Sequence, residues 1–589
     1  MSGSTSIEYI DDALALCKKS FVAAAVYSFG INILMLTPIF YMINVFDKAV
    51  ATGSTSTLFS LIVIAIFLYF VMGLLEWTRS RVLIHIGSRL DKLLAGRLYA
   101  LCFEAHSGQV SIGNIGSQPL SDLNNLRQFL AGPLIVALFD LPWIPLFLLI
   151  MLFFHPVLAA VALVCMVVMG VIAVANQRST TNGLQDANRA ASKIAQATQK
   201  NLRNAEAAWA MGMLNPLMSR WRASQDEMLK IQSDTSEVAS GYGALIKVLG
   251  VAIQSAAITT GAMLAMAQEI SPGVVIGAAL LLGKTLQPIQ VAVGGWKGMV
   301  EAREQYTRLD SLLKAFPLPE GKMPLPPIKG HISAKNVEVT PPGAEEPTLT
   351  GVNFNLQPGT VTMIVGPSAA GKSTLLRAIL GLWPTTRGEM RIDGAEADSY
   401  DRFEIGSRIG YLPQDIELFD GSVAENIARF GELDSEAVVQ AARDAGVHEM
   451  VLALPEGYNT VISGQQGLIS PGQRQRIALA RAVYGRPSLL LLDEPNSNLD
   501  DSGEQALNEA ILALKNAGST VVLVSHRQGA LPLVDYLIFV QEGRISDQGT
   551  KAEIVERTKL QQQKQMQQQQ EAQAAKATTA NESVGVTDV

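Results

Sequence analysis

One glycine-rich segment of the sequence has the residue types and the spacing of a nucleotide-binding loop. The apolar run Val361–Val365 predicts a buried strand, and a helical run begins shortly after it at Lys372. In such a strand–loop–helix unit, backbone N–H groups and the positive end of the helix dipole face the phosphates of a nucleotide. We expect Lys372 to reach the β- and γ-phosphates and the Ser373 hydroxyl to bind Mg²⁺. The predicted ATP contacts of this segment are Gly366, Pro367, Ser368, Ala369, Ala370, Gly371, Lys372, Ser373 and Thr374.

Two further apolar runs end in polar residues that suit phosphate chemistry. The run 489–492 leads into Asp493 and Glu494, and the run 521–524 is followed closely by His526. An aspartate at such a strand end holds Mg²⁺, and a neighbouring glutamate orients or activates the attacking water. We therefore predict that Asp493 is a metal ligand, Glu494 the catalytic base and His526 a catalytic sensor of the γ-phosphate.

A second helix start is also suited to attract an anion. Ser470 is a favourable N-cap, and Pro471 fits the first helical position ahead of the helical run 477–484. Helix N-termini attract phosphate groups because their backbone N–H groups are unpaired and the helix dipole is positive there.

The strands and helices that must position these residues occupy the second half of the chain, and the first half is more apolar and less charged. Apolar residues make up 48% of the 589 residues and charged residues only 17%, below the roughly 25% of a soluble domain. The charge deficit lies before the phosphate-binding loop. There, six stretches are close to the length and apolarity that a membrane span needs: 21–45, 58–75, 133–154, 156–175, 244–267 and 273–291.

A proline-rich segment separates the apolar half from a run of alternating strand and helix patterns. We therefore predict an α-helical transmembrane domain of six spans fused to an α/β P-loop nucleotide-binding domain. The expected divisions are a short N-terminus (1–20), the transmembrane domain (21–314), the linker (315–330), the ATPase domain (331–558) and a Gln-rich, disordered tail (559–589).

Charge placement predicts how the chain is oriented. Lysine and arginine are concentrated in the two long segments that follow the second and the fourth apolar stretch. Since such residues mark the cytoplasmic side, we expect these segments, both termini and the ATPase domain in the cytoplasm. We predict that the two basic segments are helices that continue out of the membrane. The net charge of −7 and the lack of a basic domain argue against nucleic acid as a partner.

Taken together, these motifs resemble those of ATP-binding-cassette (ABC) transporters. The signature of that family, Leu-Ser-Gly-Gly-Gln, matches residues 469–473 with Ile469 for leucine and Pro471 for glycine. The resemblance implies type I ABC exporter architecture with two cassettes facing each other. Each signature then completes the ATP site of the other chain through Ser470, Gly472 and Gln473, so a homodimer is expected.

The resemblance assigns three further residues by motif. Gln414, within Tyr-Leu-Pro-Gln, matches the glutamine loop that links nucleotide and membrane domain, and is implied as a catalytic residue and Mg²⁺ ligand. Ser497 and Asp500 match the loop that communicates across the dimer. One feature departs from the family: no aromatic residue precedes the phosphate loop where adenine is usually stacked. Val339 or Pro341 is the expected substitute.

The membrane half resembles transporters of type I protein secretion, and among them exporters of alkaline proteases and S-layer proteins. The segments that carry this likeness are 139–145, 203–213 and 411–430. The resemblance implies export of an unfolded protein with an uncleaved C-terminal secretion signal across the bacterial inner membrane. It also implies a periplasmic membrane-fusion adaptor, a TolC-type outer-membrane channel and a secreted substrate of the calcium-binding repeat protease or S-layer type, with ATP and Mg²⁺ as cofactors.

Other functions stay open at this point. About 20 residues precede the first apolar stretch, so we expect no leader-processing peptidase domain there. An exporter of lipids, drugs or other small amphiphiles is the alternative within transport; a non-transport ABC ATPase and an ATP-regulated channel are alternatives outside it. For Arg79 and Arg81, one interpretation places them at the entry of a translocation channel, and the other has them set topology or solvate helix ends. Segments 106–112 and 205–214 are expected to touch the cassettes.

Overall fold

The computed structural model describes residues 10–106, 116–317, 325–462, 469–525 and 527–560. The chain divides into two compact units. One comprises Met1–Phe103 with Ile115–Leu318, and the other comprises Glu104–Asn114 with Pro319–Val589.

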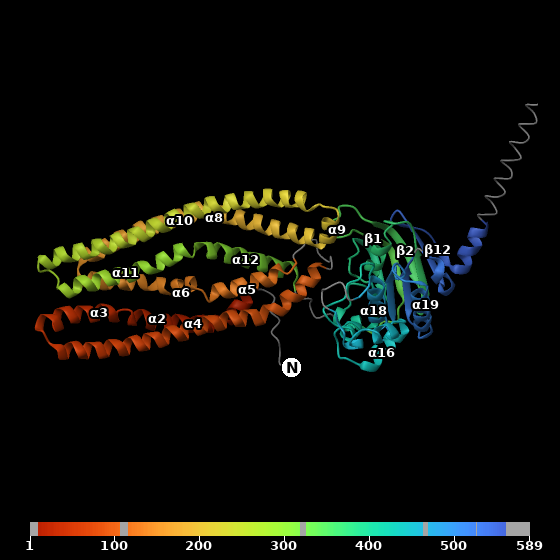
Figure 1. The fold of residues 1–589 in the computed structure, drawn as a ribbon, viewed down its shortest axis with the longest axis horizontal. Coiled ribbons are helices and arrows are strands. Elements are labelled where there is room, and N and C mark those ends of the chain that lie inside the picture. The colour runs from red at the N-terminus through yellow and green to blue at the C-terminus, as the bar shows by residue number, and fades with distance from the viewer. Residues whose placement is uncertain (1–9, 107–115, 318–324, 463–468, 526, 561–589) are drawn as a thin grey trace, which may run out of the picture. The chain divides into compact units, whose positions relative to one another are not determined.

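The first unit is built of helices, several of them very long (Figure 1). In chain order they are α1 (Ile10–Leu16), α2 (Lys18–Leu34), α3 (Thr37–Asn44), the π-helical η1 (Val45–Val50), α4 (Thr55–His106), α5 (Gln118–Leu130), α6 (Pro133–Asp140), η2 (Leu141–Trp143), α7 (Ile144–Phe154), α8 (Pro156–Arg203), α9 (Ala205–Ala210), α10 (Leu214–Met266), α11 (Pro272–Gly294) and α12 (Trp296–Ala315).

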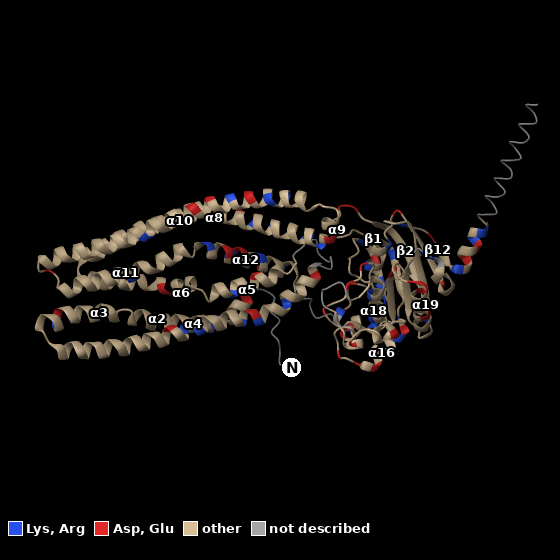
Figure 2. Cartoon of the chain, in the orientation of Figure 1, with Lys and Arg blue, Asp and Glu red and all other residues tan. Residues whose placement is uncertain are grey.

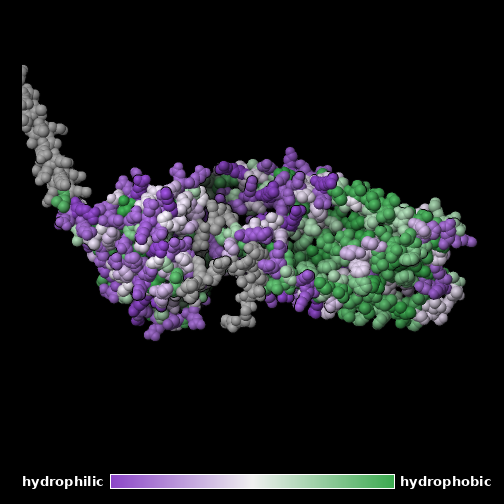
Figure 3. Space-filling model, turned by 180° about the vertical axis from the view of Figure 1, so that it is seen from behind, coloured by the Kyte–Doolittle hydropathy of each residue, from purple (hydrophilic) through white to green (hydrophobic). Residues whose placement is uncertain are grey.

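Six helical stretches of this unit are long and apolar enough to cross a membrane. Among the described residues they match the six predicted spans, the fifth ending one residue earlier than predicted, so that part of the fold prediction is confirmed: Lys18–Val50, Thr55–Ala105, Pro133–Phe154, Pro156–Arg203, Leu214–Met266 and Pro272–Gly294. Apolar side chains form a continuous surface over part of this unit (Figure 3). Charged residues are sparse along α3 and α11 and become frequent on α12 (Figure 2).

The basic segments continue the spanning helices, as predicted. Helices α4, α8 and α10 have 52, 48 and 53 residues. At 1.5 Å per residue they are roughly 70–80 Å long, more than twice the ~30 Å of the bilayer core. Each therefore extends well beyond its span as a polar helix, and these extensions carry most of the basic residues of the first unit.

Arg79 occupies a position that neither interpretation of it anticipated. Its side chain is only 1% exposed. Its guanidinium donates to Glu76 on its own helix at 2.6 Å, to Asp140 at the end of α6 at 3.0 Å and to Ser28 on α2 at 3.0 Å. Arg79 thus joins α4 to α6 through an ion pair and to α2 through a hydrogen bond, and its burial shows that it does not solvate a helix end, whereas a role at a channel entry stays a prediction. Arg81 instead stacks on the Trp77 ring, 4.2 Å from its centroid.

The second unit combines three sheets with short helices. Its elements are β1 (Ile332–Val339), β2 (Leu349–Leu356), β3 (Val361–Val365), α13 (Lys372–Ile379), β4 (Arg387–Ile392), β5 (Ala395–Glu396), α14 (Arg402–Ile405), η3 (Gly406–Arg408), β6 (Ile409–Leu412), β7 (Gly421–Ser422), α15 (Val423–Ile427), α16 (Ser435–Asp444), α17 (His448–Leu452), η4 (Gly457–Asn459), β8 (Val461–Ile462), α18 (Pro471–Val483), β9 (Leu489–Asp493), α19 (Asp501–Asn516), β10 (Thr520–Val524), η5 (Gln528–Leu533), β11 (Tyr536–Gln541) and β12 (Arg544–Thr550).

The central sheet has the strand order β12-β11-β3-β10-β9-β6 and is parallel except for β12. A four-stranded antiparallel sheet, β2-β1-β4-β5, and the pair β7-β8 complete the unit. The predicted α/β domain with a largely parallel sheet is therefore confirmed.

Both faces of the central sheet are buried, which explains the unbroken apolar runs of its strands. Successive side chains of a strand point to opposite faces. In β9, Leu490 and Leu492 pack with residues of α15, α16, α18 and α19. Leu489 and Leu491 pack with α13 and the antiparallel sheet. This two-sided core fixes the register of the strands and thereby the positions of the residues at their carboxyl ends.

Candidate nucleotide-binding site

The register of the parallel strands brings the predicted site residues to one edge of the central sheet. Leu412 of β6 pairs with Leu492 of β9, Asp493 pairs with Val524 of β10, and Val524 pairs with Ile364 of β3. The residues directly after these strands therefore lie side by side. They include the phosphate-binding loop after β3, Gln414 after β6 and Glu494 after β9.

The loop after β3 has the backbone of a phosphate-binding loop. Gly371 has a φ of +100°, which favours glycine, and it precedes Lys372 at the start of α13. A Cβ on Gly366 would lie 2.1 Å from the carbonyl oxygen of Val540, so only glycine fits there. The two glycines thus permit the loop to wrap around the helix N-terminus, as the sequence predicts.

Lys372 folds back over its own loop. Its ammonium donates to the carbonyl oxygens of Gly366 and Pro367, both at 2.8 Å. The side chain is buried, and this burial lowers the pKa of Lys372, while the negative charges of Glu494 and Asp493 partly oppose the shift. A cation held among neutral carbonyl groups gains stronger partners when phosphate oxygens enter the loop.

The surroundings of Asp493 suit a metal ligand. Its side chain is buried, and neither carboxylate oxygen accepts a hydrogen bond from the described residues. Burial raises the pKa of Asp493; Ser373 and Arg377 act in the opposite direction. An uncompensated buried carboxylate is costly, and a divalent cation compensates it. Asp493 and Ser373 therefore fit Mg²⁺, whose ligands in nucleotide sites are one or two protein oxygens together with phosphates and waters.

Glu494 is held at the strand end in an unusual backbone conformation. Its φ is +51°, which non-glycine residues adopt rarely and mostly at functional sites. Its N–H donates to the carbonyl of Val524 at 3.0 Å. The side-chain amide of Gln414 donates to Glu494 Oε2 at 3.3 Å. The arrangement presents a carboxylate beside the phosphate loop, which suits a base for an attacking water.

The signature helix α18 begins as predicted. Ser470 is its N-cap and Pro471 its first residue. Ser470 Oγ accepts from the backbone N–H of Gln473 at 3.3 Å, and Gln473 Oε1 accepts from the N–H of Ser470 at 2.9 Å. A Cβ on Gly472 would lie 2.9 Å from the Asn498 carbonyl. The capping box orders this helix start, while its contact with ATP on a second chain stays a prediction.

The loop with Ser497 and Asp500 is tied to both the signature helix and the catalytic strand end. The N–H of Ser497 donates to the Glu494 carbonyl at 3.2 Å. Asp500 caps α19, and the N–H of Gly503 donates to its carboxylate at 2.9 Å and lowers the pKa of Asp500. Asp500 also pairs with Arg476 of α18. The dimer role of Ser497 and Asp500 remains a prediction, and the structure adds an intrachain one.

Two residues of α18 that were not predicted as site residues connect this helix to the loop after β9. Gln475 is buried, its amide donates to the Pro495 carbonyl, and its Oε1 accepts from the Asn498 N–H at 3.1 Å. Arg476 forms the ion pair with Asp500. Their signal in the sequence is faint: a glutamine two residues after Gln473, on a helix that is otherwise apolar on its buried side.

The structure corrects one predicted contact and does not describe another. His526 lies outside the described residues. Val339 is fully buried in the core between the sheets, so its proposed packing against adenine is wrong. Pro341 is half-buried and lies two residues beyond β1, and it remains the predicted adenine contact.

Comparison with known proteins gives a consistent result. Residues 21–289 match the ABC transporter transmembrane region, and residues 349–497 match the ABC transporter family. The type I secretion system ATP-binding protein PrsD of Rhizobium meliloti (strain 1021) is 40% identical over 92% of this chain and 94% of its own length. The leukotoxin translocation ATP-binding protein LktB of Mannheimia haemolytica is 27% identical over 92% of this chain and 77% of its own.

The fold is also found among solved structures. A bacterial Atm1-family ABC exporter with ATP bound superimposes with a TM-score of 0.79, covering 92% of this chain and 97% of that one, at 18% sequence identity. At this identity the likeness concerns the fold alone.

Proposed function

Because the chain belongs to the ABC transporters, among the ATP-binding proteins of type I secretion systems, we propose that it exports an unfolded protein with an uncleaved C-terminal secretion signal. The chain is a multi-pass membrane ATPase with a helical membrane domain. The proposed transport crosses the inner membrane of a bacterium, with the ATPase domain and both termini in the cytoplasm.

One observation carries the ATP-dependent part of the proposal: the buried carboxylate of Asp493 has no hydrogen-bond partner among the described residues and lies beside the phosphate loop. A purely structural aspartate at this place would be paired. A nucleotide with its metal ion supplies the missing charge. The 40% identity to a protein of a secretion system supports protein, rather than lipid or drug, as the cargo.

The residues of the site have distinct roles in ATP binding and hydrolysis. Lys372 exchanges its two carbonyl acceptors for phosphate oxygens when ATP binds. Ser373, Asp493 and Gln414 would hold Mg²⁺, which when bound neutralises phosphate charge. Glu494 accepts the proton of the attacking water. The remaining phosphate contacts, from Ser470, Gly472 and Gln473, come from the second chain of a homodimer.

The proposal includes the partners of a secretion machine. A periplasmic membrane-fusion adaptor and a TolC-type outer-membrane channel continue the path beyond the lipid bilayer, and the cargo is a calcium-binding repeat protease or an S-layer protein.

A secretion assay tests the proposed export of this cargo. Bacteria that carry the Glu494→Gln chain should retain the cargo inside the cell, with its C-terminus intact, while wild-type cells release it. Unchanged medium proteins together with an altered lipid composition would instead indicate a lipid exporter.

The homodimer has a test of its own. Chains with Lys372→Ala and chains with Ser470→Asp should each be inactive alone. Mixed dimers contain one site in which Lys372 and Ser470 are both intact, on different chains. Co-purified mixed dimers should therefore recover part of the ATPase activity. A mixture as inactive as either parent would contradict completion of each site by the second chain.

A further inference from the structure

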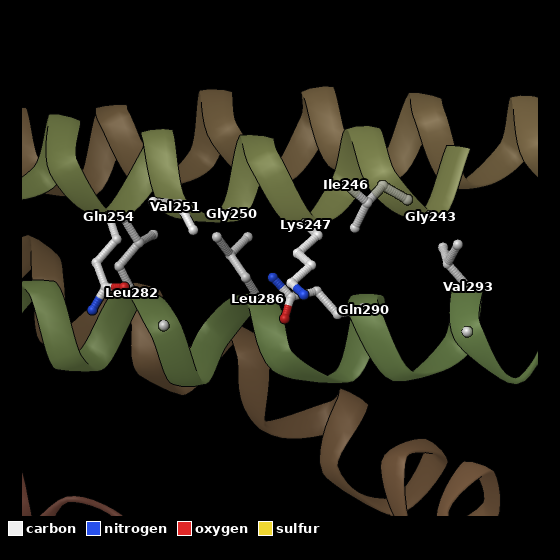
Figure 4. Close-up of a pocket in the computed structure, with 12 residues that line it drawn as sticks. Gly243, Ile246, Lys247, Gly250, Val251, Gln254, Leu282, Leu286, Gln290 and Val293 are labelled. Atoms are coloured by element: carbon white, nitrogen blue, oxygen red, sulfur yellow. The ribbon is translucent and has the colours of Figure 1, made fainter. Parts of the chain in front are cut away.

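A cavity of about 460 Å³ lies between α10 and α11, two helices that are long and apolar enough to cross a membrane. Figure 4 shows that Lys247 and Gln254 of α10 and Gln290 of α11 extend into it from its two walls. Most of the remaining wall is apolar or glycine, including Leu286, Gly250 and Gly283. A cavity with three polar side chains in such a wall has the make-up of a ligand site.

These three polar side chains face the cavity unpaired within the part of the chain that the structure describes. Among the described residues, no hydrogen bond or ion pair involves the side chain of Lys247, Gln254 or Gln290. Arg79, in the same unit, is neutralised by Glu76 and Asp140. The Lys247 side chain is exposed on α10, so its ammonium group is accessible to a ligand in the cavity. Lys247 is therefore available to pair with an anionic group of a ligand.

The glycines around these groups keep the cavity open. A Cβ on Gly250 would lie 2.7 Å from Gln290 Nε2, so glycine at this position lets the Gln290 amide approach α10. A Cβ on Gly283 would meet nothing within 4 Å and would project into open space. Larger side chains at either position would displace Gln290 or fill the cavity.

The polar groups match an extended peptide better than a lipid headgroup. Lys247 and Gln254 are two helical turns apart, roughly 10 Å along α10, which is the length of about three residues of extended chain. A glutamine amide donates and accepts, so it suits the N–H and C=O groups of a peptide, which must be paired inside a membrane. A lipid phosphate group only accepts hydrogen bonds, so by itself it would leave the glutamine amide oxygens without a donor.

Building on the proposed function, we propose that this cavity binds a carboxylate of the exported polypeptide together with the extended backbone next to it. Lys247 forms the ion pair with the carboxylate, and Gln254 and Gln290 pair with the peptide groups. The carboxylate is either the C-terminus of the cargo or an aspartate or glutamate side chain. Lys247 thus selects acidic segments of the cargo.

Binding of defined peptides to the full-length protein tests the site. The probes are N-dansyl peptides of glycine and serine in three forms: a free C-terminus, an amidated C-terminus with one internal aspartate, and an amidated form without charge. The protein is held in phosphatidylcholine nanodiscs, and dansyl fluorescence reports binding. We expect at least one carboxylate form to bind about tenfold more tightly than the uncharged form, and the form that does so identifies the carboxylate.

Variants assign the effect to the cavity. Lys247→Gln should abolish the preference for a carboxylate, and Lys247→Arg should keep it. Lys284→Gln is the matched control, because Lys284 is a lysine of the neighbouring helix α11 that contacts Gln287 at 3.3 Å and does not line this cavity. Gly283→Leu should weaken binding of all three peptides. Unchanged basal ATPase activity shows that each variant is folded.

Three results would overturn the site. The first is a Lys247→Gln protein that binds the peptides like wild type, and the second is a Lys284→Gln protein that loses the carboxylate preference equally. The third is peptide binding that phosphatidylglycerol in the nanodiscs abolishes in wild type but not in Lys247→Gln. The last would make the ligand a lipid phosphate. If no peptide binds while export still depends on Glu494, the site is wrong and the proposed function stands. Export that does not depend on Glu494 would remove the proposed function itself.

Discussion

The side-chain amide of Gln414 donates a hydrogen bond to Glu494 Oε2 at 3.3 Å, between residues that are 80 positions apart in the sequence. Both residues stand two positions beyond a pair of aligned leucines, Leu412 and Leu492, in neighbouring parallel strands. The register of β6 and β9 therefore sets where the catalytic carboxylate points. A shift of either strand end changes the position of Glu494 relative to the phosphate loop.

Replacement of the carboxylate should separate ATP binding from hydrolysis. Glu494→Gln keeps the shape of the side chain and its contact with Gln414, but the amide does not accept a proton from water. We expect the ATPase rate to fall by about 100-fold or more, with ATP affinity unchanged. Purified protein assayed for phosphate release and for nucleotide binding checks both. Glu509→Gln, on the exposed side of α19, is the control; comparable turnover in both variants would remove Glu494 from the role of base.

The buried carboxylate of Asp493 should make the nucleotide-free protein sensitive to pH. Its pKa is raised, so the folded state holds this proton more tightly than the unfolded chain does. The contribution of Asp493 to stability therefore declines as the pH rises from the ordinary aspartate pKa through the raised one. Asp493→Asn should remove this part of the pH dependence without lowering the melting temperature of the nucleotide-free protein.

The same substitution should abolish stabilisation by the metal–nucleotide pair. Wild-type protein should gain about 2.7 kcal/mol at a Mg·ATP concentration of 100 times Kd. Asp493→Asn should gain no more with Mg·ATP than with ATP and a chelator. Thermal unfolding of wild-type and Asp493→Asn protein, each with Mg·ATP and with ATP and a chelator, measures this. A full magnesium-dependent shift in Asp493→Asn would show that the ion is held without this carboxylate.

Variants of Ser470 should distinguish helix capping from phosphate binding. Ser470→Ala removes the oxygen that accepts from Gln473 N–H and should cost about 1 kcal/mol of stability. Ser470→Asp keeps a good N-cap but brings a negative charge to the place where phosphate is expected. We expect Ser470→Asp to melt like wild type and to lose ATPase activity, as measured on the same preparation. Activity in Ser470→Asp would contradict phosphate contact at this residue.

The sequence was sufficient for features that depend on local pattern. The strand end at Asp493 and Glu494 was predictable because both residues follow one unbroken apolar run. The start of α18 was predictable because Ser470 suits the N-cap and Pro471 the first helical position. The six spans followed from length and apolarity alone. In each case the signal lies in adjacent residues, and a fold that buries both faces of the sheet preserves it.

Features that depend on partners distant in the sequence were not predictable. Arg79 lies in a basic stretch and resembled a topology signal, whereas its partner Asp140 comes from another helix. Val339 lies where the family places an adenine contact, but the antiparallel sheet turns its side chain into the core. The unpaired state of Lys247 likewise appears only once α10 and α11 are placed together.

Arg79 and Arg81 should behave very differently when each is replaced by glutamine. Arg79→Gln leaves the half-buried Asp140 and the exposed Glu76 without their shared cation; because the Arg79 side chain itself is buried, the loss should approach the roughly 3–5 kcal/mol of a broken buried pair. Arg81→Gln removes only a stacking contact with Trp77, worth about 0.5–1 kcal/mol at an exposed site. We therefore expect Arg79→Gln to lower the melting temperature in detergent and to reduce ATPase activity and secretion together, because the helical unit is destabilised as a whole. Arg81→Gln should stay close to wild type in all three. A stable Arg79→Gln protein that hydrolyses ATP but does not secrete would return Arg79 to a role in the transport path.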